Sequence, residues 1–345
     1  GSYFMVGCFD MSPDHQFLAC GSEFDAGVHA WRLDVDSSGQ TTAEPWGVFG
    51  VDRQDDGETF CVKFLSRHGL LLGGTSSGAI LVWNVAAKTP DPVVELVSHA
   101  EPVWDFALLS GGAFVSCAQD GDVLLWNDGV DTDEPVYLIG SEESVVWSLA
   151  ASPESTLIAT GASTGGDGHP GLVSVYCRES AECVASMTGH SARVVAVAFT
   201  HDAARVVSGS WDNTLIIWDV AKKTQLHVLR GHKDNVCWLA PVAGGMIVSG
   251  SMDGTMRSWD EHGVCIGVTQ ELRWETGHRL RLTMSGISVP AHEQWVMCKV
   301  GRLLVRYDDL LLSHNEVSMH ALLSFWAQGR ATQRPGEAST SSIWL

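Results

Sequence analysis

Three residues of one stretch, His190, Ser208 and Asp212, carry the side chains of a nucleophilic catalytic set. In such a set the histidine takes the proton of the serine hydroxyl, and the carboxylate orients the histidine. The same residue types recur twice at nearly the same spacing, as His99, Ser116 and Asp120 and as His232, Ser249 and Asp253. An enzyme has no use for three copies of one nucleophile. The recurrence therefore favours a structural role over catalysis.

Two other motifs resemble ligand sites but stand in the wrong context. Gly166, Gly168 and Gly171 match the GxGxxG of dinucleotide-binding proteins, but the segment leads into a strand rather than opening a helix that could hold a phosphate. The acidic loop Asp128–Glu134 lacks the glycine and the terminal glutamate of a calcium-binding EF-hand loop. The histidines show no metal-binding spacing. We therefore expect no metal, no cofactor and no enzymatic activity.

Short strands must position the recurring set. Between Gly189 and Asp219, the runs Val194–Phe199, Arg205–Ser210 and Thr214–Trp218 are rich in valine and isoleucine and are bounded by turn residues. A fourth run, Gln225–Leu229, is followed by a second Gly-His pair, where the pattern begins again. The unit is therefore four strands long, and the chain repeats it.

An aromatic residue ends the third strand of every unit, at intervals of 41 to 52 residues: Trp31, Trp83, Trp126, Tyr176, Trp218, Trp259 and Tyr307. A period of roughly 40–45 residues with Gly-His and Trp-Asp ends is the signature of a propeller blade. The chain resembles the WD-repeat family over about residues 4–325. The resemblance implies an all-β fold, a seven-bladed β-propeller of four-stranded antiparallel blades. It also implies that each His, Ser, Asp and Trp set forms a buried hydrogen-bonded chain that fixes its blade.

Several units depart from the pattern. Unit 1 contains a long polar segment, Asp34–Glu44, which we expect to be a loop. Unit 2 lacks Gly-His and has Ser77 at the turn aspartate, while unit 4 has Ser141 at the histidine and an insertion at Ser163–Gly171. Unit 7 lacks the Asp and the Ser. Its last strand is expected at Val317–Phe325, where apolar residues alternate, although a capping box just before that segment also fits a helix.

WD propellers commonly bind partners on the top rim, around one mouth of the central channel. Three positions of each unit face it: the third and fifth residues after the histidine, and the residue before the turn aspartate. Carried over to this sequence, these positions predict a protein-binding rim at Phe60, Trp104, Arg193, Trp211, Asn235, Met252 and Arg281. The other residues at these positions are Phe24, Glu58, Pro102, Gln119, Val195, Cys237 and Thr283.

Tryptophan, arginine and methionine are enriched at interfaces and their hot spots, which supports this rim as a binding surface. The alternative for Trp104 is that it packs inside blade 3. The partner segment is expected to be mixed, with an apolar or aromatic anchor on the tryptophan faces and a carboxylate or carbonyl group reaching an arginine.

The formal net charge of −20 at pH 7 argues against nucleic-acid and anionic-membrane partners, which need clustered cations. It favours partners with basic patches, unless the charge only keeps the protein in solution. No CxxC pair occurs among the nine cysteines, and most lie in expected strands: Cys8, Cys20, Cys61, Cys117, Cys237 and Cys298. They fit buried thiols of a reducing compartment, and therefore a cytoplasmic or nuclear location.

We expect residues 1–326 to form a single propeller and residues 327–345, rich in polar residues, to form a mobile tail. The function expected is a non-catalytic scaffold or adaptor that binds a protein or peptide. Two alternatives remain: a structural subunit buried in an obligate complex, and a propeller enzyme or small-ligand binder that uses the central channel.

Overall fold

A computed structural model of the chain describes residues 6–14, 16–22, 27–35, 41–50, 58–65, 69–97, 99–127, 135, 137–141, 144–165, 169–268, 295–298 and 303–306. These residues form six four-stranded sheets and one two-stranded sheet, all antiparallel. We call the six four-stranded sheets blades 1 to 6 in chain order.

The strands of the first three blades have the following bounds. Blade 1 contains β1 (Val6–Met11), β2 (Phe17–Ser22), β3 (Val28–Val35) and β4 (Thr41–Phe49). Blade 2 contains β5 (Thr59–Phe64), β6 (Leu70–Thr75), β7 (Ala79–Asn84) and β8 (Val94–Val97). Blade 3 contains β9 (Val103–Leu108), β10 (Phe114–Ala118), β11 (Asp122–Trp126) and β12 (Tyr137–Ser141), with a short 3-10 turn η1 (Ser110–Gly112).

The remaining strands continue the same order. Blade 4 contains β13 (Val146–Ala151), β14 (Leu157–Ser163), β15 (Gly171–Cys177) and β16 (Cys183–Thr188). Blade 5 contains β17 (Val194–Phe199), β18 (Arg205–Ser210), β19 (Thr214–Asp219) and β20 (Thr224–Arg230). Blade 6 contains β21 (Val236–Val242), η2 (Ala243–Gly245), β22 (Met246–Ser251), β23 (Met256–Trp259) and β24 (Cys265–Val268). The two-stranded sheet pairs β25 (Trp295–Cys298) with β26 (Leu303–Arg306).

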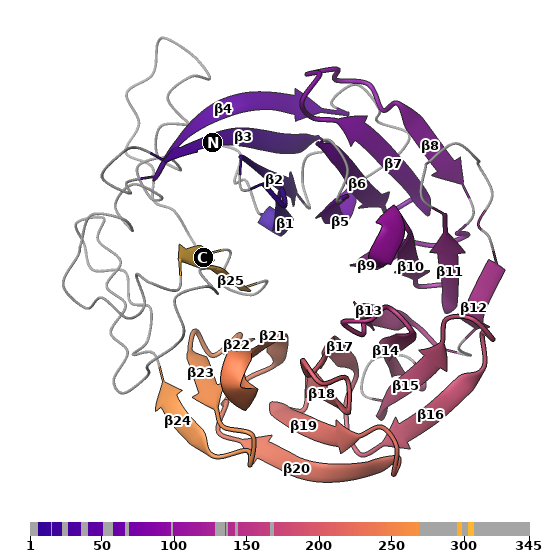
Figure 1. Ribbon diagram of the computed structural model, residues 1–345, viewed down its shortest axis with the longest axis vertical. Coiled ribbons are helices and arrows are strands. Elements are labelled where there is room, and N and C mark those ends of the chain that lie inside the picture. The colour runs from indigo at the N-terminus through magenta and orange to yellow at the C-terminus, as the bar shows by residue number, and fades with distance from the viewer. Residues whose placement is uncertain are drawn as a thin grey trace.

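The blades are arranged around a central channel (Figure 1). In each blade the first strand lies innermost and the fourth lies on the circumference, and neighbouring first strands contact one another from β1 to β21. All first strands begin at the same end of the ring, which we call the top face. The loops before the first strands and the turns between the second and third strands therefore lie together on the top face.

The core of the protein lies between adjacent blades. One cluster packs Val173 and Val175 of blade 4 against Val206, Ile216 and Trp218 of blade 5, and every one of these side chains is at most 1% exposed. In blades 2 to 5 the strands present apolar side chains on both faces, because each of these blades is covered on both sides by its neighbours. Burial of this kind contributes about 25 cal/mol per Å² of apolar surface.

The strands expected in blade 5 are confirmed, and those at Val194–Phe199 and Arg205–Ser210 have the predicted bounds. The expected cysteine positions in strands are also confirmed, from Cys8 in β1 to Cys298 in β25. The expected loop at Asp34–Glu44 is wrong at both ends, because Asp34 and Val35 belong to β3 and β4 begins at Thr41. Backbone pairing between Val35 and Thr41 extends these strands through polar residues.

Some sequence expectations fall outside the described residues. These are the rim positions Phe24, Arg281 and Thr283, the aromatic Tyr307, the segment Val317–Phe325 and the tail 327–345.

Candidate protein-binding surface

The three recurring sets form the hydrogen-bonded chains that the sequence predicts. In blade 5, Trp218 Nε1 donates to Ser208 Oγ over 2.7 Å, Ser208 Oγ lies 2.8 Å from His190 Nε2, and His190 Nδ1 lies 2.8 Å from Asp212 Oδ2. An indole N–H only donates and a carboxylate only accepts, so Trp218 donates to Ser208 and His190 donates to Asp212.

The sets of blades 3 and 6 have the same geometry, with Trp–Ser and Ser–His distances of 2.8 Å and His–Asp distances of 3.1 and 3.0 Å. The serines Ser116, Ser208 and Ser249 are 0% exposed, so their hydroxyl groups have no access to a substrate. Blade 2 lacks the chain: Gly73 stands at the serine position, and Trp83 Nε1 is buried without a hydrogen-bond partner.

Each aspartate of a set also holds the neighbouring backbone. Burial alone would raise the pKa of Asp212, but hydrogen bonds from His190, Thr214 and the Ser191 N–H, with the charge of His190, lower that pKa to about 2. In blade 6, burial is likewise outweighed by hydrogen bonds from the Lys233 N–H, Thr255 and His232, which lower the pKa of Asp253 to about 2. These aspartates are therefore ionised across the physiological pH range.

In blades 2 to 6, a β-bulge near the start of the first strand leaves one residue outside the regular pairing close to the top face. The pairing of β9 with β10 skips Trp104, that of β13 with β14 skips Trp147, and that of β5 with β6 skips Phe60. Bulges of this kind re-aim a side chain and are common beside functional sites. The same position is Val195 in blade 5 and Cys237 in blade 6.

The bulged aromatics join a continuous stack across four blades, which we call the aromatic ladder: Phe60, Trp104, Trp147, Arg193 and Trp211. The ring centroids of Phe60 and Trp104 are 4.8 Å apart, and those of Trp104 and Trp147 are 4.9 Å apart. The Arg193 guanidinium lies 4.6 Å from the Trp147 ring centroid and 3.2 Å from that of Trp211. All five residues are partly exposed.

Backbone hydrogen bonds and core packing hold the ladder in place, in addition to the contacts between its own side chains. The Trp211 N–H donates to the Arg193 carbonyl over 3.1 Å, which fixes the two backbones together. Trp104 packs against the buried cluster between blades 3 and 4, so it is both a core residue and a surface residue. Its Nε1 atom is buried and has no hydrogen-bond partner, which leaves an indole donor unused at the centre of the ladder.

The structure thus brings together four of the seven predicted rim residues, namely Phe60, Trp104, Arg193 and Trp211. Asn235 and Met252 contact each other on blade 6, where Asn235 Nδ2 lies 3.7 Å from Met252 Sδ and Met252 is 52% exposed. Arg281 lies outside the described residues.

Trp147 is the ladder residue that the sequence reasoning missed. Counting five residues from Ser141, which replaces the histidine of that unit, arrives at Val146 instead. The recurring pair Val103-Trp104 and Val146-Trp147 was the signal that could have found it.

Comparisons with known proteins agree with this geometry. The family model "WD domain, G-beta repeat" matches residues 90–127, 134–169, 181–219 and 223–260. Four WD40 repeats are therefore present in the chain.

Curated relatives of this WD40 protein match only in part. Autophagy-related protein 16 of Arabidopsis thaliana is 31% identical over 28% of this chain and 20% of its own length. WD repeat-containing protein 37 of Pongo abelii is 28% identical over 59% of this chain and 40% of its own length. The chain therefore spans less than half of the length of these relatives.

A solved structure resembles the WD40 chain over most of its length. The crystal structure of Chaetomium thermophilum Sqt1, bound to the N-terminus of the ribosomal protein L10, superposes with a TM-score of 0.66. It is 19% identical and covers 87% of this chain and 81% of that one, so the likeness concerns the fold. Within the described part of the WD40 chain, no helix is long and apolar enough to cross a membrane.

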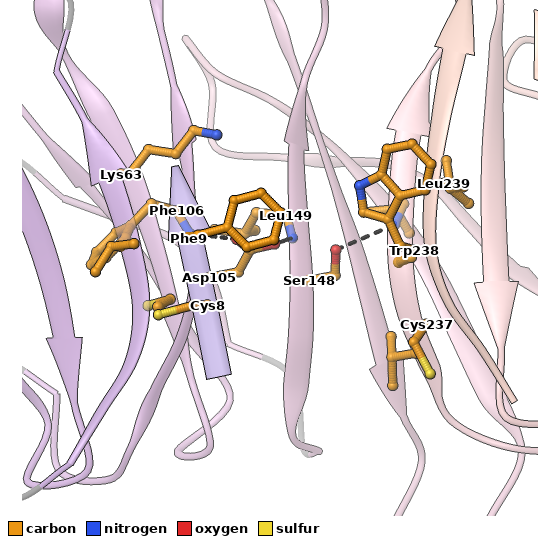
Figure 2. A pocket seen from close by; sticks show the side chains of 15 residues that line it. Cys8, Phe9, Lys63, Asp105, Phe106, Ser148, Leu149, Cys237, Trp238 and Leu239 are labelled. Carbon is orange, nitrogen blue, oxygen red and sulfur yellow. Dashed lines mark hydrogen bonds between the residues drawn. The ribbon is translucent and has the colours of Figure 1, made fainter. Parts of the chain in front are cut away.

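The central channel of this WD40 ring is lined by the first strands of all six blades (Figure 2). Most polar groups that line it join one blade to the next. The Leu149 N–H donates to Asp105 Oδ2 over 3.0 Å, and the Val197 N–H donates to Ser148 Oγ over 3.2 Å. Cys8 and Cys61 occupy the same position, and their thiols donate to the carbonyls of Thr59 and Val103.

Lys63 is the lining residue with a basic side chain, and its ammonium group lies 3.2 Å from Asp10 Oδ1. The other oxygen of Asp10 accepts the Phe64 N–H over 2.7 Å. The charged groups of the described channel are therefore engaged in holding blades together. They do not converge on a common point as an acid, a base and a nucleophile would.

Proposed function

We propose that this WD40 protein is a non-catalytic scaffold or adaptor, and that its top face binds a peptide segment of a partner protein along the aromatic ladder. The observation that carries the proposal is the ladder itself. Large aromatic rings from four blades lie partly exposed in one row, and three of them, Phe60, Trp104 and Trp147, stand at β-bulges. Central aromatic residues of this kind dominate the binding energy of many interfaces.

The blades supply a suitable support for such a site. Hydrogen-bonded chains fix blades 3, 5 and 6 next to the top-face loops, so the ladder is preorganised and little conformational entropy is lost on binding. Sqt1, whose fold is similar, was solved with the N-terminus of a ribosomal protein bound to it. That observation concerns Sqt1, and it supports a peptide as the class of partner for this chain.

The proposal extends to parts of the chain beyond the ladder. We assign β25 and β26 to a seventh blade, within one propeller over residues 1–326 and followed by a tail at residues 327–345, and Arg281 to the rim of that blade. Protein partners, rather than nucleic acid or membrane, are supported by the net charge of −20. A cytoplasmic or nuclear location is supported by relatives named as ribosome biogenesis and U3 snoRNP-associated proteins.

The test compares proteins captured from cell extract by the wild-type chain and by Trp211→Ala, quantified by mass spectrometry. Trp211 is partly exposed and, unlike Trp104, belongs to none of the described hydrophobic clusters. Loss of an aromatic hot spot typically costs about 2 kcal/mol, or about thirtyfold in affinity. The main partner should therefore be lost from the variant while its melting temperature stays near that of the wild type.

Lys222→Ala is the matched control, because Lys222 is an exposed residue at the opposite end of blade 5 and pairs with Asp219 over 2.7 Å. It should capture the same proteins as the wild type. A folded Trp211→Ala variant that retains every partner would mean that binding occurs on another surface.

A further inference from the structure

The residues around the ladder carry an excess of negative charge. Among the described residues of the top-face loops and turns, the carboxylates are Glu58, Glu101, Asp120, Asp122, Asp212, Asp234 and Asp253. The cations there are Arg193, Arg230 and Lys233. Glu58 and Glu101 are exposed, and they lie two and three residues before the ladder residues Phe60 and Trp104.

The structural sets maintain this charge. Hydrogen bonds keep Asp212 and Asp253 ionised, with pKa values of about 2. Burial lowers the pKa of His232, so the imidazole beside Asp253 is neutral at pH 7 and does not cancel the carboxylate. The set of blade 6 therefore adds a negative charge to the top face.

The arginine of the ladder offsets only one of these negative charges. Both faces of the Arg193 guanidinium are occupied, by Trp147 on one side and Trp211 on the other. A guanidinium between two rings acts as a spacer that orients them. Because seven carboxylates face three cations on the described top face, a partner cation is favoured over the partner carboxylate that the sequence predicts at Arg193.

We infer that the segment bound along the ladder is basic, with arginine or lysine side chains flanking an apolar or aromatic anchor. This inference rests on the proposed function. The anchor packs against the partly exposed rings of the ladder. The cations lie beside Glu58 and Glu101 at one end and near the aspartates of blades 5 and 6 at the other. Like-charged segments are excluded by repulsion, so the same charges set specificity.

The probe is a random dodecapeptide library displayed on phage, selected in parallel on the wild-type protein and on Trp211→Ala. Peptides enriched on the wild type alone depend on the ladder, and we expect these to carry a positive net charge. One such peptide is then synthesised and its affinity measured by fluorescence anisotropy. Raising the ionic strength from about 0.01 M to about 0.15 M shortens the screening length from about 30 Å to about 8 Å and should weaken binding.

Charge reversals distinguish the effect of the charges beside the ladder on peptide binding from the effect of the net charge of the protein. Glu58→Lys and Glu101→Lys together should weaken the synthetic peptide on the order of tenfold, mainly by slowing association. Glu182→Lys and Glu154→Lys are the matched control, since both residues are exposed at the opposite end of blade 4 and the change in net charge is the same. The control pair should change the affinity by less than about twofold, because salt screens charges that lie far from the ladder.

Two outcomes would overturn the inference in distinguishable ways. Ladder-dependent peptides that are neutral or acidic, or that bind equally well after the reversals at Glu58 and Glu101, would refute a basic partner and leave the ladder as a binding site. If no peptide depends on Trp211, the proposed function fails and the inference fails with it.

Discussion

The substitution Asp212→Asn tests how much the hydrogen-bonded chains stabilise the fold. It keeps the size of the side chain but removes the charge that His190, Thr214 and the Ser191 N–H stabilise. The folded pKa of Asp212 is about 2, against an ordinary value of 3.8. A pKa lowered by nearly 2, at about 1.36 kcal/mol for each pKa unit, gives about 2 kcal/mol of unfolding free energy at neutral pH. The Asp212 side chain is only 10% exposed, so screening by solvent reduces this value little.

The sign of the pH dependence follows from the direction of the shift. Because the folded pKa is lower than the unfolded one, this stabilisation is complete above pH 3.8 and is lost as the pH falls toward 2. Urea unfolding of the wild type and of Asp212→Asn should therefore differ by about 2 kcal/mol at neutral pH, and the difference should shrink steadily below pH 3.8. Glu182→Gln, an exposed carboxylate changed to an amide, is the control and should match the wild type throughout. A difference that does not change with pH would refute the charge-based account.

Three further predictions concern the ladder and the end of the chain. Arg193→Lys keeps the charge but loses the planar group between Trp147 and Trp211, so partner binding should fall, as measured by anisotropy, whereas a purely electrostatic role would leave it unchanged. Trp104→Ala should lower the unfolding free energy by about 3 kcal/mol in urea titrations, because this side chain also packs in the core, and this separates it from Trp211→Ala. Deleting residues 327–345 should leave the melting temperature nearly unchanged, and deleting from Val317 should lower it; equal melting of both truncations would contradict a strand at Val317–Phe325.

The sequence predicts the structure best where only a few residue types can satisfy a buried polar group. A buried indole N–H needs an acceptor, a buried imidazole needs partners at both nitrogens, and Ser208 and Asp212 supply them at fixed distances along the strands. The same requirement recurs in blades 3 and 6, so the repeat is readable residue by residue. The bounds of the first two strands of blade 5 follow from the apolar runs and the turn residues that flank them.

The sequence predicts poorly where a contact joins different blades or where backbone pairing acts alone. Trp147 and Arg193 are 46 positions apart and meet only because bulges and blade packing bring them together. Their contact leaves no local pattern in either unit. The extension of β3 and β4 through polar residues rests on pairing between Val35 and Thr41, which hydrophobic periodicity cannot reveal.

The most direct test of the ladder as a binding site is photo-crosslinking from its edge. A photoreactive amino acid replaces Gln119, an exposed top-face residue whose N–H donates to the Pro102 carbonyl two residues before Trp104. In a second protein it replaces Lys222 at the opposite end of blade 5. The account predicts that the partner is crosslinked from position 119 and not from position 222, and that Trp211→Ala abolishes the crosslink. Equal crosslinking from both positions, or crosslinking from position 222 alone, would contradict it.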